Sequence, residues 1–292
     1  MGFMSAFDNL KYKFERFSIA EKLIVVNVFF FIIPFFLQTL FYLFKIPNLS
    51  FFSWFELLPN FNVLLYRPWT LITYGFLHGG FRHILWNMLL LFFASRLYLN
   101  LFSDRQFLKN YFLGITSGGL VFLISYNVFP VFNGIFPPLV GSSAGVMSIL
   151  IFVATYMPNK EFRVIFFNIK LQYIGIGLVV LDILQIPNGN AGGRLAHLGG
   201  ALIGFVYANQ LQKGNDIGAV LDRMWGYVNS FFVSNKKNNM RTVHRSKNRS
   251  QENLSNLQQE KIDSILDKIS KSGYESLTQK EKDFLFEAGK NN

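Results

Sequence analysis

The sequence contains no cysteine and little charge. Without cysteine, its 292 residues can form neither disulfides nor thiolate metal sites. Charged residues make up only 15% of the chain, which is low for a soluble domain, whereas 51% of the residues are hydrophobic and 35 are Phe. The His-Glu-x-x-His pattern of metal-dependent proteases is also missing, and we expect neither a metal nor another cofactor. The composition therefore predicts a polytopic membrane protein with one main membrane domain.

Six apolar runs give the membrane domain its expected architecture. They fall at residues 23–44, 83–101, 107–128, 143–157, 171–186 and 196–210. The segment between the first two runs is rich in aromatic residues but too polar to cross, which predicts a loop embedded in the membrane boundary. The connector between the fourth and fifth runs is polar. The sequence thus predicts an all-α membrane protein with a bundle of six transmembrane helices.

Positive charge predicts the orientation of this bundle. Lys and Arg concentrate at the N-terminus, in the connectors after spans two and four, and in the C-terminal tail. The positive-inside rule then places both termini in the cytoplasm. The net charge of +11 comes without any nucleic-acid fold signature, so we expect contact with lipid and no binding of nucleic acid. The compact six-span form predicts a bacterial inner (plasma) membrane.

The regions outside the core differ in composition. The chain divides into a cytoplasmic N-terminal segment (1–22), a six-span core (23–210), an interfacial amphipathic helix (211–234), a basic flexible linker (235–260) and a small helical C-terminal segment (261–292). The linker carries enough Lys and Arg to contact anionic lipids. In the last segment, Gly273 ends a first short helix, and Thr278 with Glu281 predicts a capping box at the start of a second. This segment is more typical of a docking or regulatory element than of a catalytic one.

A run of small residues opens the fourth span. It reads Gly141-Ser142-Ser143-Ala144-Gly145 and leads directly into the apolar run. Ser143 would lie in the first helical turn, where free backbone N–H groups and the positive helix end suit an alkoxide or an oxyanion. Taken alone, this window is more typical of a packing seam between membrane helices.

Three histidines support a functional role for Ser143. His78, His83 and His197 are expected at the outer ends of spans two and six, at the same depth as Ser143. Ionisable groups at membrane depth are costly, so they favour a functional site. A serine at hydrogen-bonding distance from a neutral imidazole is an activated nucleophile.

Residue spacing predicts which faces meet. Asn87 follows His83 by four positions, so both lie on one face of span two. Gly200 and Gly204 are also four apart and would let span six approach a neighbour closely. That approach would bring His197 against the span that begins with Ser143. Each feature taken alone has a structural explanation, either a polar clamp between helices or close helix packing. Their occurrence together at one depth of the membrane favours a functional site.

Together these motifs resemble the rhomboid intramembrane serine proteases, over residues 23–210. They are His-x-x-x-Asn in span two, Gly-x-Ser at the head of span four and Ala-His-x-x-Gly-x-x-x-Gly in span six. The resemblance implies a serine endopeptidase that cleaves transmembrane helices near the outer membrane face. It implies a Ser143–His197 dyad without a third, acidic member, in which Ser143 attacks the scissile carbonyl and His197 transfers the proton.

The resemblance also implies supporting roles. The oxyanion would be held by the backbone N–H of Ser143 and by the side chains of His83 and Asn87. His78, Gly141, Gly200 and Gly204 would support the site structurally, and span five would form part of a lateral gate. The sequence departs from the family pattern at three places: Ala144 replaces a glycine, Met147 replaces an aromatic residue, and Arg67-Pro68-Trp69 stands where a Trp-Arg pair is usual.

Substrates and alternatives follow from this reading. We expect single-span membrane proteins whose helix unwinds easily, because a scissile amide must leave its helical hydrogen bonds before it is attacked. One alternative is a catalytically inactive rhomboid-like protein that binds membrane helices, although such relatives usually lack the serine or the histidine. The other is a transporter with His83 and His197 as proton relays. A transporter would need acidic partners inside the bundle, and only Asp182 qualifies.

Overall fold

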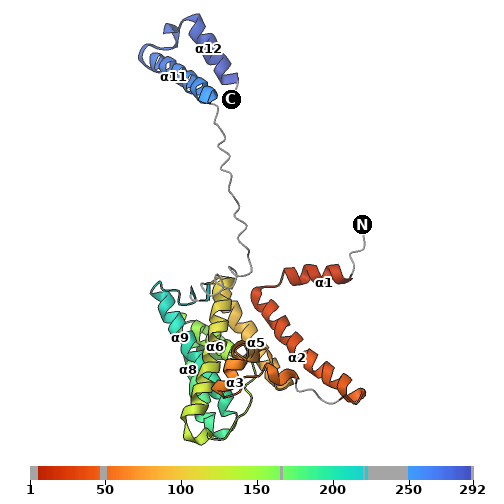
Figure 1. Cartoon of the computed structure of the whole chain (residues 1–292). Coiled ribbons are helices and arrows are strands. Elements are labelled where there is room, and N and C mark those ends of the chain that lie inside the picture. The colour runs from red at the N-terminus through yellow and green to blue at the C-terminus, as the bar shows by residue number, and fades with distance from the viewer. Residues whose placement is uncertain (1–5, 47–50, 165–166, 220, 223–248, 291–292) are drawn as a thin grey trace. The chain divides into compact units, whose positions relative to one another are not determined.

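The computed structural model describes two units of the chain, and Figure 1 shows their helices. The described residues are 6–46, 51–164, 167–219, 221–222 and 249–290. The first unit is Met1–Phe232 and the second is Val233–Asn292. Most of the predicted interfacial helix and the basic part of the predicted linker, with its expected lipid contacts, lie outside the described residues.

A long helix covers each of the six apolar runs in the first unit. These helices are α2 (Ile19–Leu43), α5 (Phe81–Leu99), α6 (Asp104–Val128), α7 (Ser143–Tyr156), α8 (Leu171–Gln185) and α9 (Ala191–Gln212), and a shorter helix, α1 (Ala6–Glu15), precedes them. Among the described residues, three helical segments are long and apolar enough to cross a membrane: α2, α6 and α8 with the turn that follows it. Helix α7 is apolar but shorter.

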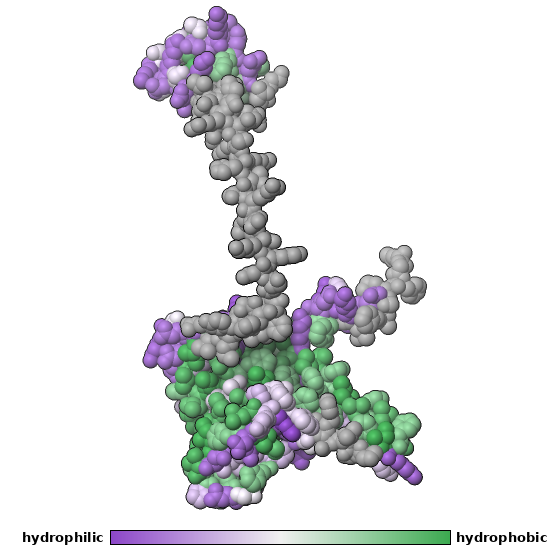
Figure 2. Space-filling model, in the orientation of Figure 1, coloured by the Kyte–Doolittle hydropathy of each residue, from purple (hydrophilic) through white to green (hydrophobic). Residues whose placement is uncertain are grey.

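The outer surface of this unit is apolar along its helices. Figure 2 shows hydrophobic residues over much of the flank on the side viewed. Phe29 and Phe36 on α2, and Ile176 and Leu184 on α8, each expose more than half of their side chains. The exposure of so many large apolar side chains would be unfavourable in water, so it fits contact with lipid.

Short helices occupy the aromatic loop between α2 and α5. They are η1 (Phe51–Trp54), α3 (Phe61–Tyr66), α4 (Thr70–Thr73) and η2 (Tyr74–Phe76). The Arg67 guanidinium lies 3.9 Å from the ring centre of Trp54, and Trp69 Nε1 donates to the Trp54 carbonyl at 2.9 Å. These contacts join η1 to the turn between α3 and α4, so Arg67 and Trp69 stabilise the loop although their order differs from the family pattern.

The connector between α7 and α8 forms a β-hairpin, where the sequence indicated only a polar loop. Strands β1 (Glu161–Val164) and β2 (Phe167–Lys170) are antiparallel, with Phe162 opposite Ile169. The alternation of apolar and polar residues is the signal for these strands. Phe162 also packs on Phe93 of α5, which holds the hairpin against the bundle.

Helix α7 forms the centre of the bundle and packs against α5, α6, α8 and α9. Another short turn, η3 (Pro130–Phe132), lies between α6 and α7. The approach of α9 depends on glycines: a Cβ on Gly200 would overlap the Ala144 carbonyl oxygen, and one on Gly204 would overlap the Ser148 carbonyl oxygen. The two backbones are therefore in direct contact. This contact fixes the level of α9 beside the first turn of α7.

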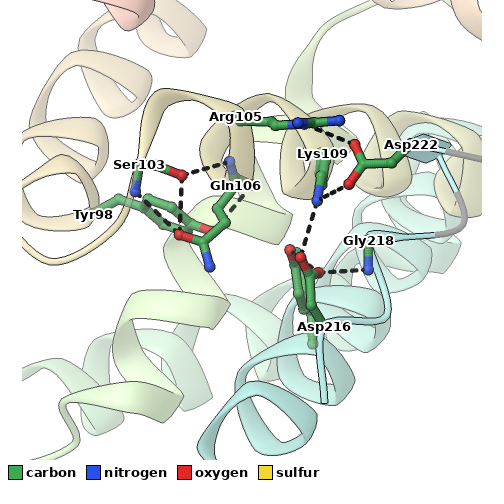
Figure 3. Close-up of polar contacts among 9 residues, drawn as sticks. Tyr98, Ser103, Arg105, Gln106, Lys109, Asp216, Gly218 and Asp222 are labelled. Carbon is green, nitrogen blue, oxygen red and sulfur yellow. Dashed lines mark hydrogen bonds and ion pairs between the residues drawn. The ribbon is translucent and has the colours of Figure 1, made fainter. Parts of the chain in front are cut away.

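A cluster of charged residues ties the chain beyond α9 to the start of α6 (Figure 3). We call it the Lys109 cluster; it comprises Arg105, Lys109, Tyr207, Asp216 and Asp222. Lys109 Nζ lies 2.9 Å from Asp216 Oδ2 and 2.6 Å from Asp222 Oδ2. Tyr207 Oη donates to Asp216 Oδ1 at 2.7 Å, and Arg105 pairs with Asp222 at 2.9 Å.

The two carboxylates of this cluster remain ionised at neutral pH. Burial raises the pKa of Asp216, but hydrogen bonds from Tyr207 and Lys109 outweigh it, so the net pKa is lowered. Hydrogen bonds from Lys109 and then Arg105 lower the pKa of Asp222. Because both values fall on folding, the cluster stabilises the fold above the unfolded pKa of about 3.9 and loses that effect as the pH falls further.

Replacing Lys109 with Met is expected to destabilise the protein by about 2 kcal/mol, because two neighbouring carboxylates lose their shared cation. The Lys109 side chain is only 8% exposed, so water compensates little. Unfolding in mixed detergent micelles measures the loss. The matched control is Arg105→Met, since Arg105 is 71% exposed and should contribute much less. Equal losses in the two variants would contradict the assigned role of Lys109.

The second unit is a helical hairpin. Helix α11 (Arg249–Ser272) begins within the range assigned to the flexible linker, because residues 249–260 are polar but rich in helix formers such as Gln and Glu. Gly273 ends it with a φ of +78°, and the turn η5 (Tyr274–Ser276) leads to α12 (Gln279–Lys290). One half of the predicted capping box forms, since the Thr278 N–H and Oγ1 donate to the Glu281 carboxylate at 2.7 and 2.8 Å. The Glu281 N–H donates to the Thr278 carbonyl at 3.0 Å rather than to its hydroxyl.

Replacing Glu281 with Ala should loosen this hairpin, because Glu281 also accepts from Lys268 of α11 at 2.9 Å. Amide hydrogen exchange in α12 is expected to become several-fold faster, whereas the exposed Glu287→Ala on the same helix should change it little. The Thr278 and Lys268 hydrogen bonds lower the pKa of Glu281 to about 2. The wild-type cap should therefore hold at neutral pH and be lost as the pH falls from about 4.3 through 2. Unchanged exchange in Glu281→Ala would contradict the assignment.

Candidate active site

A cavity of about 1260 Å³ lies among α5, α6, α7, α8 and α9. Much of its wall is apolar, with Trp86, Phe122, Met147, Leu178 and Leu181 among the lining side chains. Polar side chains also reach it, including Arg82, His83, Asn87, Ser143, Asp182, Arg194 and His197. The predicted site residues that carry reactive groups therefore lie around one space, although they come from three separate helices.

Ser143 begins α7, and the two adjacent serines have different surroundings. Ser142 is fully buried, and its Oγ lies 3.1 Å from His78 Nε2. Burial, with His83 nearby, lowers the pKa of His78 to about 4, so His78 is neutral at pH 7. Ser143 lines the cavity and Ser142 does not. Ser143 is thus the serine open to a ligand, and the His78–Ser142 contact supports the turn that leads to it.

Gly141 allows the chain to turn into α7 beside His83. Its φ of +126° lies in the region that favours glycine, and its N–H donates to the Tyr74 carbonyl at 2.9 Å. A Cβ here would lie 2.7 Å from His83 Nε2 and 3.6 Å from Ser143 Oγ. The side chains of His83 and Ser143 therefore flank the same small space.

Two donors of α5 reach the cavity. The Gly79 N–H donates to His83 Nδ1 at 3.4 Å, so the hydrogen of a neutral His83 is on Nε2, the atom that faces Gly141. The Asn87 amide donates one hydrogen to the His83 carbonyl at 2.9 Å, and its second hydrogen has no partner among the described residues. An imidazole N–H and an amide N–H are suitable partners for an oxyanion.

His197 is held by an acid on the neighbouring helix. Its Nδ1 lies 3.1 Å from both carboxylate oxygens of Asp182, which belongs to α8 and is 6% exposed. Arg194 Nη1 lies 3.0 Å from Asp182 Oδ1. The contacts among the described residues include no hydrogen bond between His197 and Ser143. Both line the cavity, and such bonds often form only when substrate is present.

The contact with Asp182 differs from the dyad implied by the motifs. From the sequence, Asp182 is expected only as an acidic partner of a proton relay, because no motif links an acid in span five to a histidine in span six. The available signal was its position, since a lone carboxylate within an apolar span is costly unless a partner compensates it. The structure supplies two partners, His197 and Arg194.

A bundle of apolar helices around a cavity with a serine, two histidines and an aspartate defines a helical membrane protein with an internal polar site. This chain belongs to the rhomboid family, since the rhomboid domain matches residues 65–213. The predicted resemblance is therefore confirmed, although α2 and most of the first loop precede the matched range. A family of unknown function (DUF6576) matches residues 251–291, which include most of α11 and α12.

Curated relatives carry the same family name. RHOMBOID-like protein 12, mitochondrial, of Arabidopsis thaliana is 31% identical over 160 residues, which are 51% of this chain and 48% of the relative. Presenilin-associated rhomboid-like protein, mitochondrial, of Homo sapiens is 29% identical over 173 residues, 57% of this chain and 44% of the relative. Rhomboid-like protein 16, chloroplastic, of Arabidopsis thaliana is 29% identical over 177 residues, 54% and 53% of the two chains. The chain spans about half the length of these relatives.

These relatives overturn the predicted location. The expected bacterial inner membrane, with termini in the cytoplasm, is wrong, because the relatives are named as mitochondrial or chloroplastic proteins and point to an organellar membrane. The physical reason is that apolar runs and loop charges report spans and their orientation but do not distinguish one membrane from another.

Proposed function

We propose that this protein is an intramembrane serine endopeptidase that cleaves transmembrane helices near the membrane face at which α7 begins. The observation that carries this proposal is the presence of Ser143, His197, His83 and Asn87 around one cavity inside an apolar bundle. A nucleophile, a base and two oxyanion donors are the groups that acyl transfer requires.

The steps follow from the position of each group. Ser143 Oγ bonds to the scissile carbonyl carbon while His197 Nε2, the nitrogen left free by Asp182, takes the hydroxyl proton. The carbonyl electron pair moves to oxygen, where the Ser143 N–H, His83 Nε2–H and Asn87 amide stabilise the charge. When the C–N bond breaks, His197 returns its proton to the leaving amine, and water then hydrolyses the acyl ester by the reverse proton path.

Substrate helices enter between α5 and α8 in this proposal. Both helices pack on α7, but they pack much less on each other, and the cavity is lined by Trp86 of α5 and Leu181 of α8. We further propose that all six long helices cross the membrane, so the chain leaves α9 on the side where α2 begins. The names of the relatives support an organellar membrane as the setting.

The expected substrates are single-span proteins whose helix unwinds easily near the cut. An amide inside an intact helix keeps its hydrogen bonds and presents no accessible carbonyl carbon. Placing a Gly-Pro pair near that end of a Leu-rich reporter helix should therefore raise the cleavage rate several-fold. Equal rates for the two reporters would contradict this substrate rule without affecting the proposed chemistry.

The test of the activity is cleavage of such a reporter by purified protein in lipid vesicles. We expect two fragments whose masses place the cut near one end of the membrane helix, and we expect no fragments after treatment with a serine-directed fluorophosphonate. If the protein retained the intact reporter in a complex, it would be a helix-binding protein instead. Proton flux across the vesicles without cleavage would favour the transporter.

A further inference from the structure

We infer that Asp182 is a positioning residue for His197 and that the site works as a Ser143–His197–Asp182 triad. The inference rests on the proposed function and deepens it, because the motifs alone imply a dyad. Asp182 lies on α8, a helix that carries none of the three motifs. Its carboxylate is the only acidic group among the described residues that lines the cavity.

The geometry fits this role. Both Asp182 oxygens lie 3.1 Å from His197 Nδ1, so the carboxylate accepts the Nδ1 hydrogen whichever oxygen is used. A neutral imidazole with its hydrogen on Nδ1 has a bare Nε2, which is the atom that must accept the Ser143 proton. Without Asp182, nothing among the described contacts of His197 would favour that tautomer. The carboxylate also stabilises the imidazolium that forms during attack.

Arg194 adjusts the strength of this effect. It precedes His197 by one turn on α9, and its Nη1 lies 3.0 Å from Asp182 Oδ1. A buried carboxylate needs such a partner to stay ionised. Arg194 and His197 thus contact the same carboxylate, so Asp182 and Arg194 place opposite charges beside the imidazole. Arg194 Nε is buried and has no hydrogen-bond partner among the described residues, so the guanidinium is held mainly through Asp182.

Other charged groups around His197 are few. His83 of α5 interacts electrostatically with it, and Arg82 at the start of α5 lines the same cavity. Neither can accept the Nδ1 hydrogen in its present state, since Arg82 has no acceptor and His83 Nδ1 already accepts from Gly79. Asp182 is therefore the group that can orient this histidine.

The test compares Asp182→Asn and Arg194→Gln with wild type in vesicles, using the Leu-rich reporter and measuring rate against pH. Asp182→Asn keeps the shape but removes the charge, and we expect kcat to fall at least about 100-fold. The acidic limb of its pH–rate profile should move to lower pH, because His197 loses the charge that favours its protonation. Arg194→Gln removes the opposing charge, so its acidic limb should move in the other direction, to higher pH.

Opposite shifts in the two variants would support the triad, because a purely structural link between α8 and α9 would not produce them. If the acidic limbs of both variant profiles stayed at the wild-type pH, with or without a loss of rate, the triad would be contradicted. If Asp182→Asn does not fold, the Arg194→Gln profile alone tests the triad. Ser143→Ala is run beside them. If it abolishes cleavage while the Asp182 and Arg194 profiles do not move, the protease proposal stands and the triad fails. If it leaves cleavage unchanged, the protease proposal fails.

Discussion

Replacing Ser143 with Ala is expected to lower the rate of reporter cleavage at least about 1,000-fold, because no other serine among the described residues lines the cavity. Ser142→Ala should keep most of the rate, since Ser142 is buried against His78 and does not line the cavity. The pair is a matched control, because each variant removes one hydroxyl from adjacent positions. Fragment formation measured by gel in vesicles gives both rates.

His197→Ala should show a loss similar to that of Ser143→Ala, because the serine and its base act as a unit. Thermal unfolding should change little in Ser143→Ala, so that its lost activity is not lost folding. Full cleavage by Ser143→Ala would contradict the assignment of the nucleophile. A loss in Ser142→Ala alone would move the nucleophile to the other serine.

Replacing Gly200 with Ala is expected to destabilise the protein by about 3 kcal/mol, because the added Cβ would overlap the Ala144 carbonyl oxygen. Backbone cannot move aside as a flexible side chain can, so α9 must shift. The shift should also reduce activity, since His197 lies one turn before Gly200 on the same helix. Unfolding in mixed detergent micelles and reporter cleavage measure the two effects.

The matched control is Gly177→Ala on the neighbouring helix α8. A Cβ at Gly177 meets no atom within 4 Å, so this change should be neutral or slightly stabilising, as alanine in a helix usually is. Similar behaviour of the two variants would show that α9 does not depend on close backbone contact. That result would contradict the packing that brings His197 to Ser143.

The helices were predictable because each long helix follows an apolar run in the sequence. The family was predictable because His83, Ser143 and His197 each lie in a local motif. The contact of the Glu281 carboxylate with the Thr278 N–H was predictable for a similar reason, since both residues lie within four positions. Short sequence patterns therefore predict the helices and those site residues that belong to a motif.

Contacts between distant residues were not predictable from pattern. Lys109 looked like one more basic residue at a helix end, yet it lies between two carboxylates more than 100 positions later in the chain. Asp182 looked like an isolated acid in an apolar span until α8 and α9 were placed side by side. Such pairs form only when whole helices pack together, and no short stretch of the sequence indicates which helices will be neighbours.

The most direct measurement is to label the purified protein with a fluorophosphonate and map the modified residue by mass spectrometry. Fluorophosphonates bond to serines that an adjacent base has activated. We expect one adduct, on Ser143, that fails to form in His197→Ala and still forms in Ser142→Ala. An adduct on Ser142, or equal labelling of Ser143 with and without His197, would contradict the claim that these two residues form the catalytic centre.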